Sequence, residues 1–307
     1  MNQPKVSIII LNWNGLQDTI ACLESLQKVT HPNCAITVVD NGSKGDDVKI
    51  LRDRYGNHVH IVANDNNYGF SEGNNIGIRA SLNQEADYLL LLNNDTVVAP
   101  NFLAELVQAA VDHNDTCIVH PKIYDYTEPG KLQFAGGKIS YLKGRVYNIG
   151  WNEVDVGQHD QVKEGEFATG CAMLIPKDLL AKVGLFDSSY FAYFEDVDLS
   201  VRVRKAGYSI IYAPKSKIWH KGTAATGGYL NAISYYFYVR NAIRFVLKHG
   251  AWWQRLVFLA YFLLIYPCLV LGYSLIHGRF DLFKAFLHGI LFHVRHKDYS
   301  RLGCNAL

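Results

Sequence analysis

The sequence predicts an α/β fold in which a mostly parallel sheet is flanked by helices. Two observations lead to this prediction. Short apolar runs of strand length alternate with segments of helical periodicity from residue 6 onward. The runs are apolar at consecutive positions and end in Asn, Asp or Gly, as do strands buried on both faces and followed by turns. Strands that alternate with helices in this way form parallel sheets covered on two sides.

The expected elements are placed by the same two periodicities. Strands are expected over residues 6–11, 35–39, 59–62, 88–92, 172–175 and 209–212. Helices are expected over residues 16–26, 46–54, 71–82 and 196–206. The stretch 120–168 is richer in Gly, Tyr and charge and has weak periodicity, so we expect irregular or hairpin structure there.

Composition excludes several classes of protein. Hydrophobic residues make up 49% and charged residues 19% of the 307 residues, which is typical of a folded chain rather than a disordered one. The net charge of +2 gives no reason to expect a nucleic-acid partner. The six cysteines form no CxxC pair, so we expect a reduced protein. Residues 1–5 lead straight into a strand without a signal peptide, which predicts that the bulk of the protein stays in the cytoplasm.

The C-terminal part predicts contact with a membrane. Residues 256–276 carry no charge over a length that can span a bilayer, although Pro267 interrupts them. An amphipathic face follows, which is typical of an interfacial helix and consists of Phe280, Phe283, Phe286, Leu287, Ile290, Leu291 and Val294. The positive-inside rule keeps the basic tail in the cytoplasm, which favours a re-entrant or shallow anchor bent at Pro267 over a clean span. A buried helical hairpin of a second soluble domain is the alternative.

Polar residues follow three of the expected strands at the point where each ends. They are Asn12 and Asn14, then Asp40, then Asn93 to Asp95. Each group alone could be a turn, but the carboxyl ends of parallel strands meet at one edge of a sheet, where ligands bind. Asp95 is the best candidate for a ligand of Mg²⁺ or Mn²⁺, because hard cations prefer carboxylate oxygens.

Two further segments are candidates for chemistry. The acidic run Glu195-Asp196-Val197-Asp198 follows an aromatic segment and could cap a helix or supply a general base. The glycines of segment 64–77 suit a loop that passes close to a ligand, although they match neither GxGxxG nor the P-loop pattern. His220 taken alone is more often structural than a metal ligand.

Taken together, these segments resemble the family 2 glycosyltransferases, and most closely their rhamnosyltransferase-like and galactofuranosyltransferase-like branches. The similar segments run in order along the chain: VSIIILNWNG at 6–15, VVDNGS at 38–43, NNYGFSEGNNIGI at 66–78, YLLLLNNDTVV at 88–98, ATGCAMLIP at 168–176, GLFDSSYFAYFEDVDLSVRVRKAGY at 184–208, WHKGT at 219–223 and YYFYVRNAIRF at 235–245. The resemblance implies a GT-A, Rossmann-like catalytic domain over residues 1–250. A membrane-associating helical region would then occupy residues 251–307.

The resemblance also implies a role for individual residues. Asp196 would be the general base and Glu195 would orient the site, while Asp95 and His220 would hold the divalent cation. The residues implied to bind the donor are Asn12, Asn14, Asp40, Asn67, Gly69, Asn74, Asn94 and Asp95. Those implied to line the acceptor site are Asp198, Arg202 and Trp219. The tripeptide Asn93-Asn94-Asp95 lacks the first Asp of the family's DxD motif, which leaves one fewer anionic metal ligand.

The expected activity is transfer of a sugar with inversion at the cytoplasmic face of the cell membrane. The donor would be dTDP-rhamnose or a UDP-linked hexose, and the acceptor a glycan carried on polyprenyl diphosphate. Two alternatives stay open. A nucleotidyltransferase would want a Gly-rich, basic loop after the first strand, where this chain has NWNG. A non-catalytic nucleotide-sugar-binding or membrane scaffold protein would not need Asp95, Asp196 and His220 together.

Overall fold

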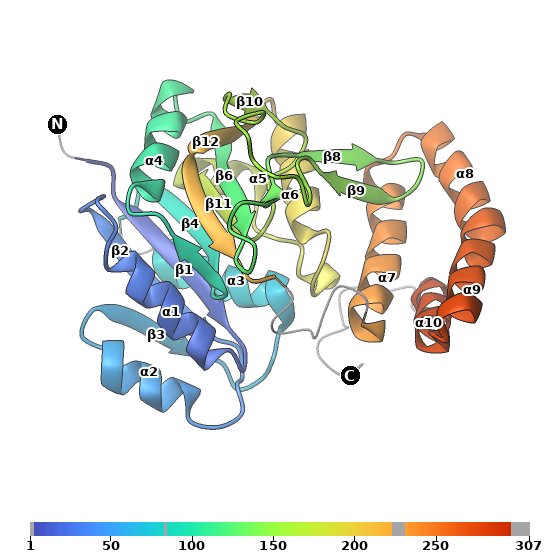
Figure 1. Ribbon diagram of the computed structural model, residues 1–307, viewed down its shortest axis with the longest axis horizontal. Helices are drawn as coiled ribbons and strands as arrows, with labels where there is room; N and C mark the ends of the chain where they lie inside the picture. The colour runs from blue at the N-terminus through green and yellow to red at the C-terminus, as the bar shows by residue number, and fades with distance from the viewer. Residues whose placement is uncertain (1–2, 83–84, 223–230, 296–307) are drawn as a thin grey trace.

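The computed structural model describes residues 3–82, 85–222 and 231–295. At its centre lies a mixed ten-stranded sheet, in which β3 (Val59–Ala63), β2 (Cys34–Asp40), β1 (Val6–Asn12) and β4 (Tyr88–Asn93) are consecutive and parallel. The helices α1 (Leu16–Leu26), α2 (Asp47–Tyr55) and α3 (Gly69–Leu82) connect these strands (Figure 1). The predicted α/β architecture is confirmed, as are these strands and helices to within a few residues.

Helix α3 lies unusually close to the sheet because two of its glycines face the strands. A Cβ on Gly77 would lie 2.4 Å from Cγ2 of Ile9, and one on Gly73 would lie 2.6 Å from Cδ1 of Leu11. We expected these glycines to border a ligand. Their nearest neighbours are side chains of β1, so they allow the helix to pack closely on the sheet.

The sheet continues beyond β4 with a change of direction. Strand β11 (Ala172–Pro176) is antiparallel to β4, and β6 (Cys117–Asp125) is antiparallel to β11. Strand β12 (Ser209–His220) then runs parallel to β6. Short strands complete the edges: β5 (Thr96–Val98) and β10 (Lys163–Glu164) pair with β12, and β7 (Leu132–Phe134) pairs with β6. Helices α4 (Phe102–Asp112), α5 (Lys177–Val183) and α6 (Glu195–Lys205) pack around this half.

The expected irregular region contains a separate hairpin of β8 (Gly137–Ser140) and β9 (Arg145–Asn148). Its tip reaches the C-terminal helices, as Figure 1 shows. A Cβ on Gly144, which has φ of +59°, would lie 2.5 Å from the ring of Phe258. Phe258 is fully buried by this contact and its neighbours.

The C-terminal helices lie to one side of the sheet, with α7 (Ala232–His249) between them and the rest of the molecule (Figure 1). A continuous helix runs over Trp252–His277, through α8 (Trp252–Ala260), a π-helical turn η2 (Tyr261–Ile265) and α9 (Tyr266–His277). This helix is long and apolar enough to cross a membrane. The π-helical turn accommodates Pro267, which lacks the N–H that an α-helix would use there. The helix therefore continues past Pro267. The chain reverses at Gly278, which ends the helix with φ of +66°.

Helix α10 (Phe280–Arg295) folds back along α9 and packs against α7. Its apolar face was expected to lie on a membrane surface. In the structure Phe286 is fully buried, 5.6 Å from Phe262 and 5.5 Å from Tyr266 between ring centroids. Phe280 and Val294 are exposed. The predicted interfacial face is thus divided, because part of it is needed to pack the helical hairpin. Residues 296–307 of the expected C-terminal region, with Cys304, lie outside the described residues.

Candidate active site

Asp95 and His220 meet because β5 pairs with the end of β12. Asp95 follows β4 in the turn Asn93-Asn94-Asp95, and Thr96 of β5 lies opposite His220 in the antiparallel register. The Lys221 N–H donates to the carbonyl of Asp95, directly beside the pairing of β5 with β12. Oδ1 of Asp95 lies 3.1 Å from Nε2 of His220, and both side chains are largely buried.

Gln133, a residue that the sequence did not single out, fixes the orientation of the His220 ring. The Gln133 amide nitrogen lies 2.9 Å from Oδ2 of Asp125 and 2.9 Å from the His220 carbonyl, and both of these atoms are acceptors. Its oxygen therefore faces Nδ1 of His220, at 2.9 Å. Nδ1 must carry a proton to make this bond, so the lone pair of the neutral ring is on Nε2, facing Asp95.

A lone pair and a carboxylate oxygen repel each other at this distance, so a proton or a cation must lie between them. Burial opposes charge on His220, but Cys171 and Asp95 raise its pKa well above the ordinary value. Burial also raises the pKa of the Cys171 thiol, so this thiol is neutral near pH 7 and the negative charge comes from Asp95. Burial likewise opposes the charge of Asp95, and His220 and Lys221 lower its pKa.

The pair fits a divalent cation. Adjacent ligands of an octahedral Mg²⁺ stand about 3 Å apart when each bond is about 2.1 Å. The separation of 3.1 Å between the two atoms matches this, and Gln133 supplies the second hydrogen bond that a metal-bound imidazole usually makes. Across the described ranges no group of three His, Cys, Asp or Glu side chains could hold a metal. Asp95 and His220 would thus hold a cation only together with ligands other than these four types of side chain.

Glu195 and Asp196 begin helix α6 and lie close to this pair. The Gly170 N–H donates to Oδ2 of Asp196 at 2.8 Å, and the Val197 N–H donates to Oδ1 at 2.8 Å. The next residue after Gly170 is Cys171, whose carbonyl accepts from the Asn93 N–H and whose thiol borders His220. The segment 170–171 therefore joins the two halves of the site.

Burial raises the pKa of both carboxyl groups in the Glu195–Asp196 pair. The pKa of Glu195 is raised well above its ordinary value by burial and then by the charge of Asp196, and backbone hydrogen bonds partly offset the effect of burial on Asp196. Among the residues that the structure describes, Oε2 of Glu195 has no hydrogen-bond partner. Because Asp196 has the hydrogen-bond donors, a shared proton belongs on Glu195, and Asp196 is the ionised member.

The aromatic loop before this pair is strained. Phe191, Tyr193 and Phe194 all have positive φ, at 62°, 70° and 74°. Such a conformation costs about 1–3 kcal/mol for each residue and persists only where its surroundings enforce it. Gly69 allows the close approach of this loop, since a Cβ there would lie 2.6 Å from the Phe191 ring. The Ser71 N–H also donates to the Phe191 carbonyl.

Only part of the aromatic segment before Glu195 is accessible. Tyr190 and Phe194 are buried in the core. Phe191 and Tyr193 are half-buried, and Phe191 stacks on Phe237 of α7 with 4.9 Å between ring centroids. Of the four aromatic side chains of this segment, these two are therefore the partly exposed ones.

The residues expected to bind the donor hold one another at the carboxyl edge of the sheet. The Asn12 amide donates to Oδ2 of Asp40, which is 1% exposed and whose other oxygen accepts from the Ser43 N–H. The Asn94 amide donates to Thr19, 3.0 Å away. These side chains therefore bind other residues of the same sheet edge.

The remaining donor candidates lie along the neighbouring loops. Asn14 is exposed, with φ of +52°, and its side-chain oxygen accepts from the Lys44 N–H. The Asn67 side-chain oxygen accepts from Asn41 and from the Gly69 N–H. Asn74 is buried and donates to the Phe70 carbonyl. Asn14 is thus exposed at its loop, and Asp95 faces the candidate metal position beside His220.

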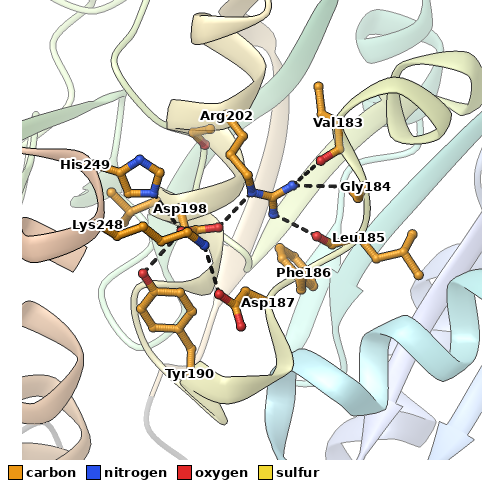
Figure 2. A network of polar contacts seen from close by, with 12 residues as sticks. Val183, Gly184, Leu185, Phe186, Asp187, Tyr190, Asp198, Arg202, Lys248 and His249 are labelled. Atoms are coloured by element: carbon orange, nitrogen blue, oxygen red, sulfur yellow. Dashed lines mark hydrogen bonds and ion pairs between the residues drawn. The ribbon is translucent and has the colours of Figure 1, made fainter. Parts of the chain in front are cut away.

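Asp198 and Arg202 occupy a different setting from the one expected. Asp198 is fully buried and contacts Lys248, His249 and Arg202 at 2.7, 2.7 and 2.8 Å, as Figure 2 shows. The guanidinium of Arg202 also donates to the carbonyls of Val183, Gly184 and Leu185. This ionic network ties α6 to α7 and to the loop after α5. We therefore correct the acceptor-lining role expected for these two residues, because their polar atoms are already engaged.

The Trp219 side chain packs against other aromatic and apolar residues. It stacks on Tyr124 with 5.8 Å between ring centroids and packs against a small cluster of core residues. Because neighbours along a strand point to opposite faces, Trp219 faces away from the side that carries His220. Its expected role in lining the acceptor site is corrected in the same way.

The chain is similar to several known proteins. Residues 7–181, more than half of the chain, match the model of glycosyl transferase family 2. A low-salt glycan biosynthesis hexosyltransferase of Haloferax volcanii is 26% identical over 217 residues, covering 67% of this chain and 63% of that protein, which is less than two thirds of its length. An N-acetylglucosaminyl-diphospho-decaprenol L-rhamnosyltransferase of Mycobacterium tuberculosis is 26% identical over 255 residues, covering 76% of this chain and 81% of the other.

A solved structure shows the same fold. The mannosyltransferase PcManGT from Pyrobaculum calidifontis, in complex with GDP-Man and Mn²⁺, superposes with a TM-score of 0.60. The match is 14% identical and covers 97% of this chain and 89% of that one.

Proposed function

Because the chain belongs to glycosyltransferase family 2 and has the GT-A fold, we propose that it transfers a sugar from a nucleotide diphosphate to a hydroxyl of a glycan, with inversion at the anomeric carbon. The observation that carries this proposal is the assembly of three groups around Gly170 and Cys171. These groups are the Asp95–His220 pair, the carboxylate of Asp196, and the strained aromatic loop beside it.

Asp196 acts as the general base of the proposed reaction. It removes the proton of the acceptor hydroxyl while that oxygen forms a bond to the anomeric carbon on the face opposite the diphosphate. The bond from the anomeric carbon to the diphosphate oxygen breaks, and its electron pair leaves with the nucleotide diphosphate. Two backbone N–H donors hold Asp196 ionised for this step, and Glu195 retains a proton beside it.

Asp95 and His220 would hold a divalent cation next to the diphosphate. The cation, Mg²⁺ or Mn²⁺, supplies positive charge that stabilises the leaving group. The Mn²⁺ of the Pyrobaculum mannosyltransferase complex supports this proposal, as does the fit of the pair described above. Asn12, Asn14, Asp40, Asn67, Gly69, Asn74 and Asn94 remain proposed donor-site residues, those without free polar atoms acting by shaping the pocket.

The donor and acceptor are proposed from the relatives. The Mycobacterium rhamnosyltransferase supports rhamnose as the sugar and a polyprenyl-diphosphate-linked glycan as acceptor, and the Haloferax hexosyltransferase supports a hexose as the second candidate. We propose dTDP-rhamnose and a UDP-linked hexose as the corresponding donors. Lipid-linked acceptors would reach the enzyme at the cytoplasmic face of the membrane. Holding enzyme and acceptor on one surface raises their effective concentration.

The C-terminal region, proposed to begin at residue 251, provides the membrane contact. The helix Trp252–His277 is largely exposed, with Leu264 71% and Ile276 79% accessible, and two exposed tryptophans stand at its start. Since α10 returns along this helix and packs on α7, a full span would draw α7 into the bilayer together with its charged contacts to the catalytic unit. We therefore propose shallow insertion of the hairpin.

A donor panel tests the proposed activity. The protein is incubated with labelled dTDP-rhamnose, UDP-glucose and UDP-galactofuranose in the presence of Mn²⁺, and sugar release and transfer are scored. One donor should be turned over, with EDTA abolishing the reaction. Tight donor binding without turnover of any donor, with or without a lipid-linked acceptor, would favour the non-catalytic binder instead.

A further inference from the structure

Arg240 and Asn241 are polar residues buried in the middle of helix α7. Asn241 is fully buried and Arg240 is 7% exposed. Buried amides and guanidinium groups are costly unless their hydrogen bonds are satisfied. The sequence motif that contains them, YYFYVRNAIRF, has no part in the proposed chemistry so far.

Both side chains bind the backbone of the loop before the Glu195–Asp196 pair. The Asn241 amide nitrogen lies 2.9 Å from the Tyr190 carbonyl oxygen and 2.7 Å from each of the Ala192 and Tyr193 carbonyl oxygens. The Arg240 guanidinium donates to the Tyr190 carbonyl at 2.5 Å and to the Ser189 carbonyl at 3.1 Å. One buried dipeptide thus gathers four carbonyl oxygens of one short loop.

Arg240 also determines which way the Asn241 amide faces. Its Nε–H donates to Oδ1 of Asn241 at 2.9 Å, so the amide nitrogen must point toward the loop. An Asp at position 241 has the same shape but no N–H to donate, and it would place an acceptor against three carbonyl oxygens. The arrangement therefore requires an amide and not merely a residue of that size.

The loop that is held is the strained one. Phe191, Tyr193 and Phe194 have positive φ, and Phe194 is the residue directly before helix α6. The direction of the first turn of α6, and with it the direction of the Asp196 carboxylate, follows from the backbone at Phe194. Without partners for the carbonyls of residues 190, 192 and 193, the loop would relax toward ordinary backbone angles.

We propose that Asn241 is a positioning residue that, with its amide oriented by Arg240, holds the loop 190–194 in its strained form and so aims Asp196 at the acceptor hydroxyl. This rests on the proposed function, in which Asp196 is the general base. It assigns to the dipeptide Arg240-Asn241 a task in catalysis although neither residue touches a substrate.

Helix α10 contacts α7 at Arg240, on the side away from the loop 190–194. Nε2 of His293 lies 2.8 Å from the Arg240 carbonyl oxygen, and the Phe292 ring lies 5.1 Å from the Arg240 guanidinium. Gly289 allows α10 to approach, since a Cβ there would lie 2.7 Å from Cγ1 of Val239. Helix α10 therefore packs on α7 at the level of Arg240, directly behind the dipeptide.

A double-mutant cycle on the full chain tests the proposal. Asn241→Ala should lower kcat about 100-fold, the effect of a misplacement of roughly 1 Å, and change the donor Kd less than about twofold. In a protein that already carries Asp196→Asn, adding Asn241→Ala should lower the residual single-turnover rate less than about threefold. The reason is that the carboxylate that Asn241 positions is already absent. Asn241→Asp should fail to restore kcat.

A second variant separates positioning from folding. Asn75 is another buried asparagine, whose side chain binds the N–H and the carbonyl of Phe186. Asn75→Ala should lower the Tm by an amount similar to Asn241→Ala while kcat stays within about threefold of wild type. Equal losses of kcat in the two variants would mean that Asn241 has only a structural role.

The outcomes distinguish this proposal from the one on which it rests. Wild-type turnover of Asp196→Asn would overturn the general base and with it the coupling. An inactive Asp196→Asn together with a wild-type kcat for Asn241→Ala would overturn the positioning role alone. Equal fold-losses from Asn241→Ala with and without Asp196 would also overturn it.

Discussion

Oε1 of Gln133 lies 2.9 Å from Nδ1 of His220, and this contact determines which ring nitrogen faces Asp95. The two residues are 87 positions apart and meet only because β7 and β12 both pair with β6. The Gln133 amide cannot turn over without placing its nitrogen against Nδ1 and its oxygen against Asp125 and a carbonyl. The Asp95–His220 pair is therefore oriented by the layer of residues behind it.

Replacing Gln133 should weaken metal binding without touching a ligand. Gln133→Leu removes the acceptor at Nδ1, so the ring loses both its fixed tautomer and its fixed orientation. Loss of such a partner typically costs 10–100-fold in metal affinity, and we expect a loss in this range. The measurement is a Mn²⁺ titration followed by electron paramagnetic resonance in the presence of nucleotide diphosphate. Gln108→Leu, on the exposed face of α4, should bind Mn²⁺ as wild type does, and an unchanged affinity in Gln133→Leu would contradict the account.

The network around Asp198 should determine stability and leave chemistry alone. Asp198→Asn removes one partner of a fully buried ionic cluster and leaves Lys248 and Arg202 short of a counter-charge. The free energy of unfolding, measured with urea, should fall by about 3–5 kcal/mol. Turnover per folded molecule should stay within about threefold of wild type. Glu24→Gln, in a half-exposed pair with Arg54, should cost less than about 1 kcal/mol.

The same carboxylate predicts how stability depends on pH. Burial opposes the charge of Asp198, but His249, Arg202 and Lys248 together hold its pKa well below the ordinary 3.8. A depressed folded-state pKa contributes stability that is present above the unfolded value and is lost as the pH falls below it. The free energy of unfolding should therefore fall below about pH 4 more steeply in wild type than in Asp198→Asn. Equal slopes of the free energy of unfolding against pH in the two proteins would show that Asp198 does not cause this pH dependence.

The role of general base that we propose for Asp196 predicts how turnover falls at low pH. Burial raises the pKa of Asp196 above 3.8, and only the ionised carboxylate can accept a proton. Turnover should therefore rise with pH through that raised pKa, so that kcat falls at a higher pH than an unperturbed aspartate would give. Each sample is returned to pH 7 and assayed again to exclude unfolding. A kcat that stays constant down to pH 4 would contradict the assignment.

The exposed apolar side chains of the C-terminal hairpin should carry membrane binding. Leu264→Glu combined with Ile276→Glu places two charges on the face that we propose to insert, and binding to vesicles containing anionic lipid should fall at least about tenfold in a flotation assay. Val156→Glu is the control, since Val156 is 81% exposed but lies far from the hairpin in sequence. Turnover of a soluble acceptor should be equal in all three proteins. Wild-type flotation of the double variant would refute the proposed contact.

The first half of the sheet could be predicted because each of its strands is a continuous apolar run closed by a turn residue. The reversal at β11 and the full length of β12 could not, since an antiparallel strand in a buried sheet is as apolar as a parallel one. The sequence correctly predicts that α10 is an amphipathic helix, but periodicity does not say whether its apolar face contacts lipid or protein.

The residues of the candidate site likewise include some that the sequence singles out and some that it does not. The sequence singles out Asp95, Asp196 and His220, because they follow strands or open a helix within recognisable motifs. Gln133 and Asn241 were missed because their effect depends on contacts across 87 and about 50 residues, which no local pattern reveals. Asp198 and Arg202 share the motif with Asp196 but point to the opposite side of α6, as expected for residues two and six positions further along a helix.

The most direct test of the account is the Asp196→Asn variant, assayed for transfer and for donor binding in the same preparation. The account predicts that transfer to the acceptor is abolished, that the donor Kd in the presence of Mn²⁺ changes less than about threefold, and that the wild-type product has the inverted anomeric configuration. Turnover of Asp196→Asn near the wild-type rate, or a product with retained configuration, would contradict it.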